Sequence, residues 1–307
     1  MPGYGVWQQT DHGGAALFAE LAAIVAPIFI CAGIGFAWAR LRKPFESEFV
    51  TAIVTTVGTP FLVFSSLTRL PLEMATVAEM AGATCLAFVG FAVVGIAVLK
   101  TSGLSLRSYL PALMFPNAGN MGLPLCLFAF GEHGLALAIV YFAVSSTLQF
   151  TVGVGIAAGS ADPRRLLRLP LIYAVLAALA VVATGVRVPG WIANTADLIG
   201  GLTIPLMLFA LGVSLARLQV GSLKRSLALS LLRLMGGAAL GFGIGWALGL
   251  SDAARGVLAI QSAMPVAVFN YLFAQLYRRE PAEVAGMIVL STLISFATLP
   301  LLLLLVL

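Results

Sequence analysis

Apolar segments of about 20 residues, the length of a helix that crosses a bilayer, follow one another along this chain with short polar connections between them. Of its 307 residues, 61% are hydrophobic and 9% are charged, which is far outside the range of soluble globular domains. A segment within lipid has no water to hydrogen-bond its backbone, so it crosses as a helix. The composition therefore predicts an all-α polytopic membrane protein.

The segments divide the chain into ten predicted transmembrane helices. They cover residues 16–39, 47–67, 76–99, 105–130, 134–158, 169–187, 194–216, 224–249, 253–277 and 283–306. We expect no further folded domain between them, because their connections are short.

Basic residues gather on one side of these helices. The loops and helix ends that follow the odd-numbered segments contain Arg40, Arg42, Lys43, Lys100, Arg107, Arg164, Arg165, Arg168, Arg217, Lys224, Arg225, Arg278 and Arg279. The opposite side contains Arg69, Arg187 and Arg255. Because cytoplasmic loops carry an excess of Lys and Arg, we expect both termini on the non-cytoplasmic side of a bacterial inner membrane.

Segment 105–130 carries residues that a continuous helix does not tolerate. Its middle reads LMFPNAGNMGLPL, with two prolines, two asparagines and two glycines. Pro116 has no N–H to donate and clashes with the preceding turn, while glycine adopts turn geometry without strain. Within lipid, such backbone is tolerated only where protein buries it or where it lines a cavity. The stretch therefore predicts a broken helix with a binding site at mid-membrane.

Three stretches of the first half have counterparts in the second half. They pair residues 59–67 with 204–212, 102–117 with 251–266, and 144–150 with 290–296. The second pairing aligns Pro116 with Pro265. We therefore predict two five-helix repeats, 1–158 and 169–307, joined by a cytoplasmic linker, 159–168. Since five crossings are an odd number, the second repeat is inverted, an arrangement typical of secondary transporters with a site at the repeat interface.

Three motifs carry a resemblance to a known family. They are PNAGNMGLPL at 116–125, QSAMPVAVFNYLFA at 261–274 and VLSTLIS at 289–295. Over essentially its whole length the chain resembles the auxin efflux carrier family, including its small bacterial members. The resemblance implies a fold like that of the bile-acid symporters. The first two helices of each repeat would form a scaffold, and the last three would form a mobile transport unit.

The resemblance also carries functional expectations. The broken helices, the fourth and the ninth, would cross at Pro116 and Pro265 beside the substrate. Members of the family move organic anions, auxin in plants and carboxylates such as malate or malonate in bacteria. The resemblance implies an elevator motion and a homodimer in the lipid bilayer.

Two features depart from the family pattern. Plant auxin exporters have a long cytoplasmic loop between their halves, whereas this chain has the short GSADPRRLLR, 159–168. In addition, Val266 stands where the first repeat has Asn117, and Asn270 lies five residues after its proline, whereas Asn120 lies four after its own. We therefore expect two chemically unequal half-sites.

Polar groups around the two prolines are the predicted binding groups. The predicted substrate-binding residues are Asn117, Gly119, Asn120, Gln261, Ser262 and Asn270. Helix ends of both signs meet at the crossing and cancel to first order, so the side chains decide which charge is bound. No carboxylate lies within about two turns, whereas a cation or proton site at this depth normally needs one. We expect a carboxylate substrate, and the alternative is that the asparagines only cap broken helix ends.

Two charged residues are candidates for a gate or for coupling. Arg233 lies within segment 224–249, two to three turns from its cytoplasmic end, so it either snorkels to the interface or acts as a gate or second anion contact. Asp197 lies near the outer end of segment 194–216, where it is either solvated at the interface or coupled to protons.

Other chemistries lack the residues that they require. The only histidines, His12 and His133, lie in a tail and a loop, so we expect no metal site and no cofactor. GVGIAA at 153–158 fits a dinucleotide fingerprint poorly because no strand precedes it. We expect no enzyme, no ATP-driven pump and no nucleic-acid partner. The leading hypothesis is a secondary carrier for an organic anion, and the alternatives are a cation or proton antiporter, a sodium symporter of related fold, and a membrane-embedded sensor.

Overall fold

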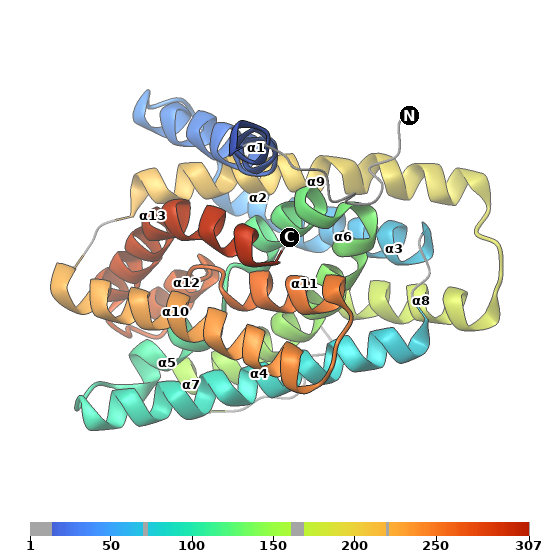
Figure 1. Ribbon diagram of the computed structural model, residues 1–307. Coiled ribbons are helices and arrows are strands. Elements are labelled where there is room, and N and C mark those ends of the chain that lie inside the picture. Colours follow the sequence, from blue (N-terminus) through green and yellow to red (C-terminus); the bar gives the residue numbers. More distant parts are fainter. Residues whose placement is uncertain (1–13, 70–72, 161–168, 219–220, 307) are drawn as a thin grey trace.

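A computed structural model describes residues 14–69, 73–160, 169–218 and 221–306. These parts of the chain are helical apart from their connections (Figure 1). Most of the predicted linker, including Arg164, Arg165 and Arg168, lies outside the described residues, as does His12. The prediction of an all-α chain is confirmed for the described residues.

The helices begin and end close to the predicted boundaries. They are α1 (Gly14–Arg40), α2 (Ser47–Ile53), π-helical η1 (Val54–Gly58), α3 (Thr59–Arg69), α4 (Met74–Thr101), α5 (Leu106–Met114), π-helical η2 (Ala118–Gly122), α6 (Leu123–Leu148), π-helical η3 (Gln149–Gly153), α7 (Val154–Ala158), α8 (Pro170–Thr184), α9 (Gly190–Arg217), α10 (Leu223–Ala247), α11 (Asp252–Ser262), α12 (Phe269–Leu276) and α13 (Pro281–Val306). Gly131, at φ 65° and ψ −159°, divides α6 into two helices, and this division lies between the predicted segments 105–130 and 134–158.

Six stretches of the described chain are long and apolar enough to cross a membrane. They are Phe49–Arg69, Met74–Thr101, Ala118–Ala158, Gly190–Arg217, Leu223–Ala247 and Pro281–Val306, and the shorter apolar helices are Ala26–Arg40 and Pro170–Thr184. The chain is therefore a polytopic membrane protein, whereas the ten-helix inverted arrangement stays a prediction.

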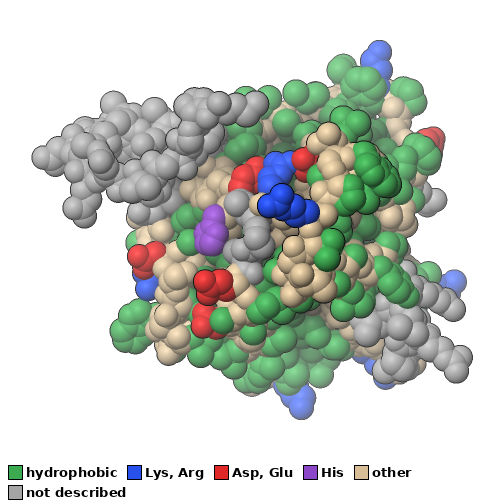
Figure 2. Space-filling model, turned by 90° about the vertical axis from the view of Figure 1, so that its right-hand side faces the viewer, with side chains coloured by type: hydrophobic (Ala, Val, Ile, Leu, Met, Phe, Trp, Pro, Cys, Tyr) green, Lys and Arg blue, Asp and Glu red, His purple; other side chains and the backbone are tan. Residues whose placement is uncertain are grey.

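The surface agrees with an apolar environment. Large apolar side chains on the outer helices are exposed, among them Trp246, Leu198 and Leu305. Seen from one end, charged side chains of both signs lie near the middle, hydrophobic side chains cover much of the margin, and a few charged side chains also reach it (Figure 2). A margin of this kind is suited to contact with lipid tails.

The helices pack in two groups. In the first, α1 lies along α9, and α3 packs on α8 and α9; in the second, α10 packs on α4, α11 and α13. Figure 1 shows α1 and α9 along one side of the molecule and α4 and α10 along the other. The first group holds the predicted scaffold helices, and the second holds helices of the predicted transport unit.

Glycines allow close helix approaches in both groups. A methyl group at Gly212 of α9 would lie 1.8 Å from the carbonyl oxygen of Ala32 in α1. On α10, Gly237, Gly241 and Gly245 face α11, where an added methyl at Gly237 would lie 2.0 Å from the carbonyl oxygen of Ser262. The glycine ladder of α10 therefore serves packing within the chain.

We expect Gly212→Ala to lower the free energy of unfolding by about 1–3 kcal/mol, because overpacking forces α1 and α9 apart. Gly201→Ala is the matched control, since a methyl group there meets nothing within 4 Å and alanine favours a helix over glycine. Thermal unfolding in detergent measures both. Equal midpoints for the two variants would contradict the close contact between α1 and α9.

Candidate functional site

The two interrupted segments meet at their breaks. Pro116 and Val266 form an isolated antiparallel bridge. The N–H of Asn117 donates to the carbonyl oxygen of Pro265 at 2.7 Å, and the N–H of Ala267 donates to that of Phe115 at 3.1 Å. Backbone groups freed by the breaks therefore find partners in each other, although the two segments lie far apart in sequence.

Local chemistry explains why the helices stop there. Proline disfavours helical geometry in the residue before it, and Phe115 is extended at φ −101° and ψ 105°. Helix α11 likewise ends at Ser262, shortly before Pro265. After the first break, the chain turns back into helix at Ala118 and continues through η2 into α6.

A cavity of about 320 Å³ lies beside this pairing. It is lined by Val50, Thr51, Val54, Thr55, Thr56, Thr59, Pro116, Asn117, Ala118, Gly119, Asn120, Phe142, Ser145, Ser146, Gln149, Phe150, Leu169, Pro170, Leu171, Met207, Ala210, Ser214, Ala267, Val268, Phe269 and Leu272. The lining mixes apolar side chains with hydroxyl and amide groups. No Asp, Glu, Lys, Arg or His is among these described residues.

Asn117 is the predicted residue with the clearest position. Its side chain lines the cavity and is only 4% exposed. It makes no capping hydrogen bond to the helix that begins at Ala118, and its Nδ2 has no hydrogen-bond partner among the described residues. The interpretation of the Asn117 side chain as a helix cap is therefore wrong, and a buried donor of a cavity-lining residue is left without a partner among the described residues. Gly119 and Asn120 also line the cavity.

Asn270 lies beside the cavity rather than in its lining. Its Nδ2 donates to the carbonyl oxygen of Phe115 at 3.2 Å, and its Oδ1 accepts from Gln149 Nε2 at 3.3 Å. Both amides are buried. Asn270 therefore ties the second break to the first and orients Gln149, which does line the cavity.

Several lining residues were not predicted. Ser145, Ser146 and Gln149 belong to the stretch 144–150, which the sequence showed only as a repeat. Thr55 and Thr56 were missed as well. Both donate their hydroxyl hydrogens to backbone carbonyls of their own helix, at 2.7 Å and 2.6 Å. Such internal hydrogen bonds are common for threonine in helices, so these threonines offer mainly acceptors to the cavity.

Gln261 and Ser262 lie away from the cavity lining. Both are fully buried at the end of α11. Gln261 packs so closely against Gly122 that a methyl group there would lie 2.1 Å from Gln261 Oε1. Pro265 likewise takes part in the backbone pairing and is absent from the lining. Substrate binding by Gln261 and Ser262 stays a prediction.

Arg233 lies in the protein interior and not at a water interface. Its side chain is 2% exposed. The guanidinium donates to three carbonyl oxygens: Nη1 to Leu113 at 2.8 Å, Nε to Met264 at 3.3 Å, and Nη2 to Ser262. It also lies 4.5 Å from the ring centroid of Phe91. The snorkelling interpretation is therefore wrong, and Arg233 is absent from the cavity lining.

Comparisons with known proteins agree with this architecture. Residues 156–303 match a family described as "Membrane transport protein". This match over the second half of the chain agrees with the resemblance to the auxin efflux carriers that the motifs predicted. An "Uncharacterized transporter MJ1031" of Methanocaldococcus jannaschii is 27% identical over 71% of this chain and 74% of its own length. A "Putative malonate transporter" of Rhizobium meliloti is 28% identical over 64% of this chain and 68% of its own length.

A third relative matches a larger share of this chain than the other two. An "Uncharacterized transporter" of Methanothermobacter thermautotrophicus is 27% identical over 83% of this chain and 88% of its own length. The predicted resemblance is thereby confirmed, and the chain is a membrane transporter.

Asp197 of this transporter is engaged in an ion pair with Arg69 and accepts a hydrogen bond from the Ser65 hydroxyl. These contacts link α9 to α3. Asp197 and Arg69 are partly exposed and do not line the cavity. The observed role of their contacts is therefore to hold α3 and α9 together. A role for Asp197 in gating or coupling stays a prediction.

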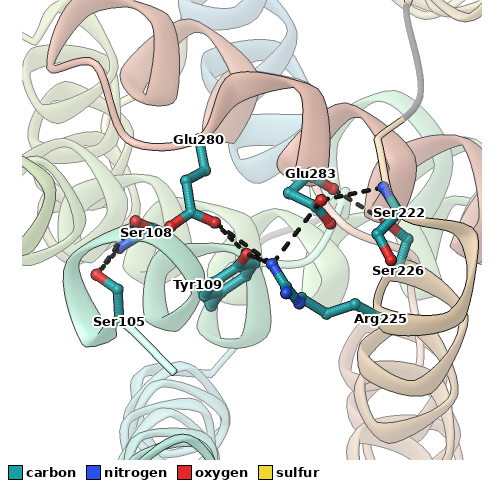
Figure 3. Close-up of polar contacts among 8 residues, drawn as sticks. All are labelled: Ser105, Ser108, Tyr109, Ser222, Arg225, Ser226, Glu280 and Glu283. Carbon is teal, nitrogen blue, oxygen red and sulfur yellow. Dashed lines mark hydrogen bonds and ion pairs between the residues drawn. The ribbon is translucent and has the colours of Figure 1, made fainter. Parts of the chain in front are cut away.

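A polar cluster that was not predicted joins α5, α10 and α13 at one end of the transporter (Figure 3). The Tyr109 hydroxyl donates to the Glu280 carboxylate, and Arg225 Nη1 donates to the Tyr109 oxygen at 3.0 Å. Arg225 also lies 3.8 Å from both Glu280 and Glu283, and Glu283 accepts from the backbone N–H of Ser222 at 3.0 Å. This group of contacts, the Tyr109 cluster, fixes α5, α10 and α13 to one another.

We expect Asn270→Ala to lower the free energy of unfolding by about 1–3 kcal/mol, because it leaves the buried amide of Gln149 without its partner. Asn194→Ala, at an exposed position of α9, should change it by less than about 0.5 kcal/mol. Thermal unfolding of both purified variants measures the difference. A loss confined to Asn194→Ala, or none in either, would contradict the buried tie at Asn270.

Proposed function

We propose that this transporter is a secondary carrier for a small organic anion, bound through a carboxylate in the cavity beside the paired breaks. The observation that carries the proposal is that Asn117 lines the cavity while its buried Nδ2 has no hydrogen-bond partner among the described residues. A buried donor left unpaired costs about 1–3 kcal/mol, so a ligand that accepts a hydrogen bond there recovers that free energy.

The backbone next to Asn117 supports an acceptor of negative charge. The helix that begins at Ala118 continues through η2 into α6. The N–H of Ala118 donates to the Pro116 carbonyl oxygen, and those of Gly119 and Asn120 precede the first N–H groups that bond back to Asn117, those of Met121 and Gly122. Helix N-termini attract anions through their free N–H groups and the helix dipole. Gly119 and Asn120, in this first turn, line the cavity. A carboxylate there would meet backbone and side-chain amide donors together.

The size of the cavity favours a small acid. At about 320 Å³ it lies at the lower end of the range of ligand sites. The relative of this transporter from Rhizobium meliloti carries the name "Putative malonate transporter". We therefore propose malonate or a comparable small carboxylate, such as malate, as the first substrate to test, with an auxin-like aromatic acid as the larger alternative.

The position of the cavity supports alternating access by an elevator motion. Residues of α2, η1, α3, α8 and α9 line it together with residues of the breaks, α6, η3 and α12. The first set belongs to the predicted scaffold and the second to the predicted transport unit. The Tyr109 cluster binds three helices of that unit together (Figure 3). Movement of the unit as one body would carry Asn117 past the scaffold.

A cation or proton antiporter and a sodium symporter are less well supported. Among the described residues that line the cavity there is no carboxylate to bind a cation. From the loop charges we also propose that the transporter lies in the bacterial inner membrane with both termini on the non-cytoplasmic side. From the family resemblance we propose that it forms a homodimer.

Uptake of labelled malonate into proteoliposomes tests the proposed function. We expect Asn117→Ala and Asn120→Ala each to raise the half-saturating concentration about tenfold to a hundredfold, because a hydrogen bond to a charged group is worth about 1.5–3 kcal/mol. Malate and indole acetate are assayed in parallel to rank substrates.

Asn194→Ala is the matched control, since Asn194 is exposed and lies outside the cavity lining. It should transport like the unaltered protein. Uptake that is absent for every acid, or equal in all three asparagine variants, would overturn the proposed site.

A further inference from the structure

Arg233 is a buried charge without a carboxylate partner among the described residues. Arg69, Arg225 and Arg255 each lie within ion-pair distance of an Asp or Glu, and all three are partly exposed. Arg233 is 2% exposed and contacts three backbone carbonyls and the face of Phe91. Burying an ion in this way is costly unless its partners compensate.

The three carbonyls have one property in common. Leu113 lies in the last turn of α5, Ser262 is the last residue of α11, and Met264 follows it. They are the carbonyl ends of the two half-helices that precede the breaks. Gly237, one turn after Arg233 on α10, has no side chain that would push the Ser262 carbonyl away. Arg233 therefore binds both negative helix ends at once.

This contact changes the electrostatic balance at the crossing. Each helix end carries about half an elementary charge, negative at the carbonyl end and positive at the N–H end. A guanidinium, which stays protonated in proteins, offsets the two carbonyl ends that it binds. The N–H ends of the half-helices after the breaks then remain as an uncompensated positive field beside Asn117.

We propose that Arg233 is a positioning residue whose buried charge gives the cavity its preference for anions without touching the substrate. This inference rests on the proposed function and adds the origin of its charge selectivity. Asn117 follows Leu113 by four residues, so the two lie at most about 14 Å apart. Arg233 Nη1 lies 2.8 Å from the Leu113 carbonyl oxygen. At an effective dielectric constant of about 20 and a separation of about 14–20 Å, its charge changes affinity by about fourfold to sevenfold for each negative charge of the ligand, and therefore by about tenfold or more for doubly charged malonate.

A simple clamp is the competing explanation. Neutral donors could hold the same carbonyls, and a clamp would affect charged and uncharged ligands equally. The test therefore compares malonate with malonamide, which has a similar size and no charge. Titration calorimetry of the purified protein measures both affinities for the unaltered chain, Arg233→Gln and Arg233→Lys, and thermal unfolding records the stability of each.

We expect Arg233→Gln to weaken malonate binding about tenfold and to leave malonamide binding within about threefold. Arg233→Lys should keep most of the preference for malonate while losing thermal stability, because it keeps the charge but not the forked geometry. Lys224→Gln, an exposed charge on the same helix, is the matched control and should change neither affinity.

The remaining outcomes distinguish a failure of this inference from a failure of the proposed function. If the unaltered protein binds malonate and Arg233→Gln keeps the same ratio of the two affinities, the charge-selectivity inference is wrong and the proposed function stands. If the unaltered protein binds no carboxylate, both are wrong. If Arg233→Gln does not fold, Arg233→Lys decides, and loss of its preference for malonate would overturn the inference.

Discussion

Two helices that stop inside an apolar environment must find partners for the backbone groups they leave free, and the rest of this structure depends on how that is done. Each break supplies what the other lacks: the N–H of Asn117 meets the Pro265 carbonyl, and the N–H of Ala267 meets that of Phe115. Proline lacks an N–H, so a single proline break would leave carbonyls unpaired. Pairing two breaks turns a defect in one helix into a joint between two.

The joint between the two breaks contacts polar groups of the cavity and, separately, the positive charge of Arg233. Toward the cavity it presents Asn117 and the start of the helix at Ala118. Away from the cavity Arg233 binds the carbonyl ends. We infer that the helix ends do not cancel, in contrast to the expectation from the sequence, because the charge of Arg233 on a third helix, α10, offsets the carbonyl ends. This asymmetry is the physical basis of the proposed preference for anions.

How much the sequence could predict depends on the range of the interactions involved. Proline, glycine and asparagine within an apolar segment mark a break locally, so Pro116 and Asn117 were identified with their surroundings. The partners of Arg233 were not, because guanidinium contacts with carbonyls far along the chain leave no pattern in the sequence. Gln149 was missed since an amide within a helix is ordinary until its position against Asn270 is known.

The central claim is that a carboxylate binds in the cavity beside Asn117. Crystals grown with bromomalonate would test it most directly, because anomalous scattering from bromine shows where the acid is bound. We predict one strong peak in the cavity, with a carboxylate within hydrogen-bond distance of the Asn117 amide and the backbone at Gly119 and Asn120. A peak outside this cavity, or a carboxylate bound directly to Arg233, would contradict the account.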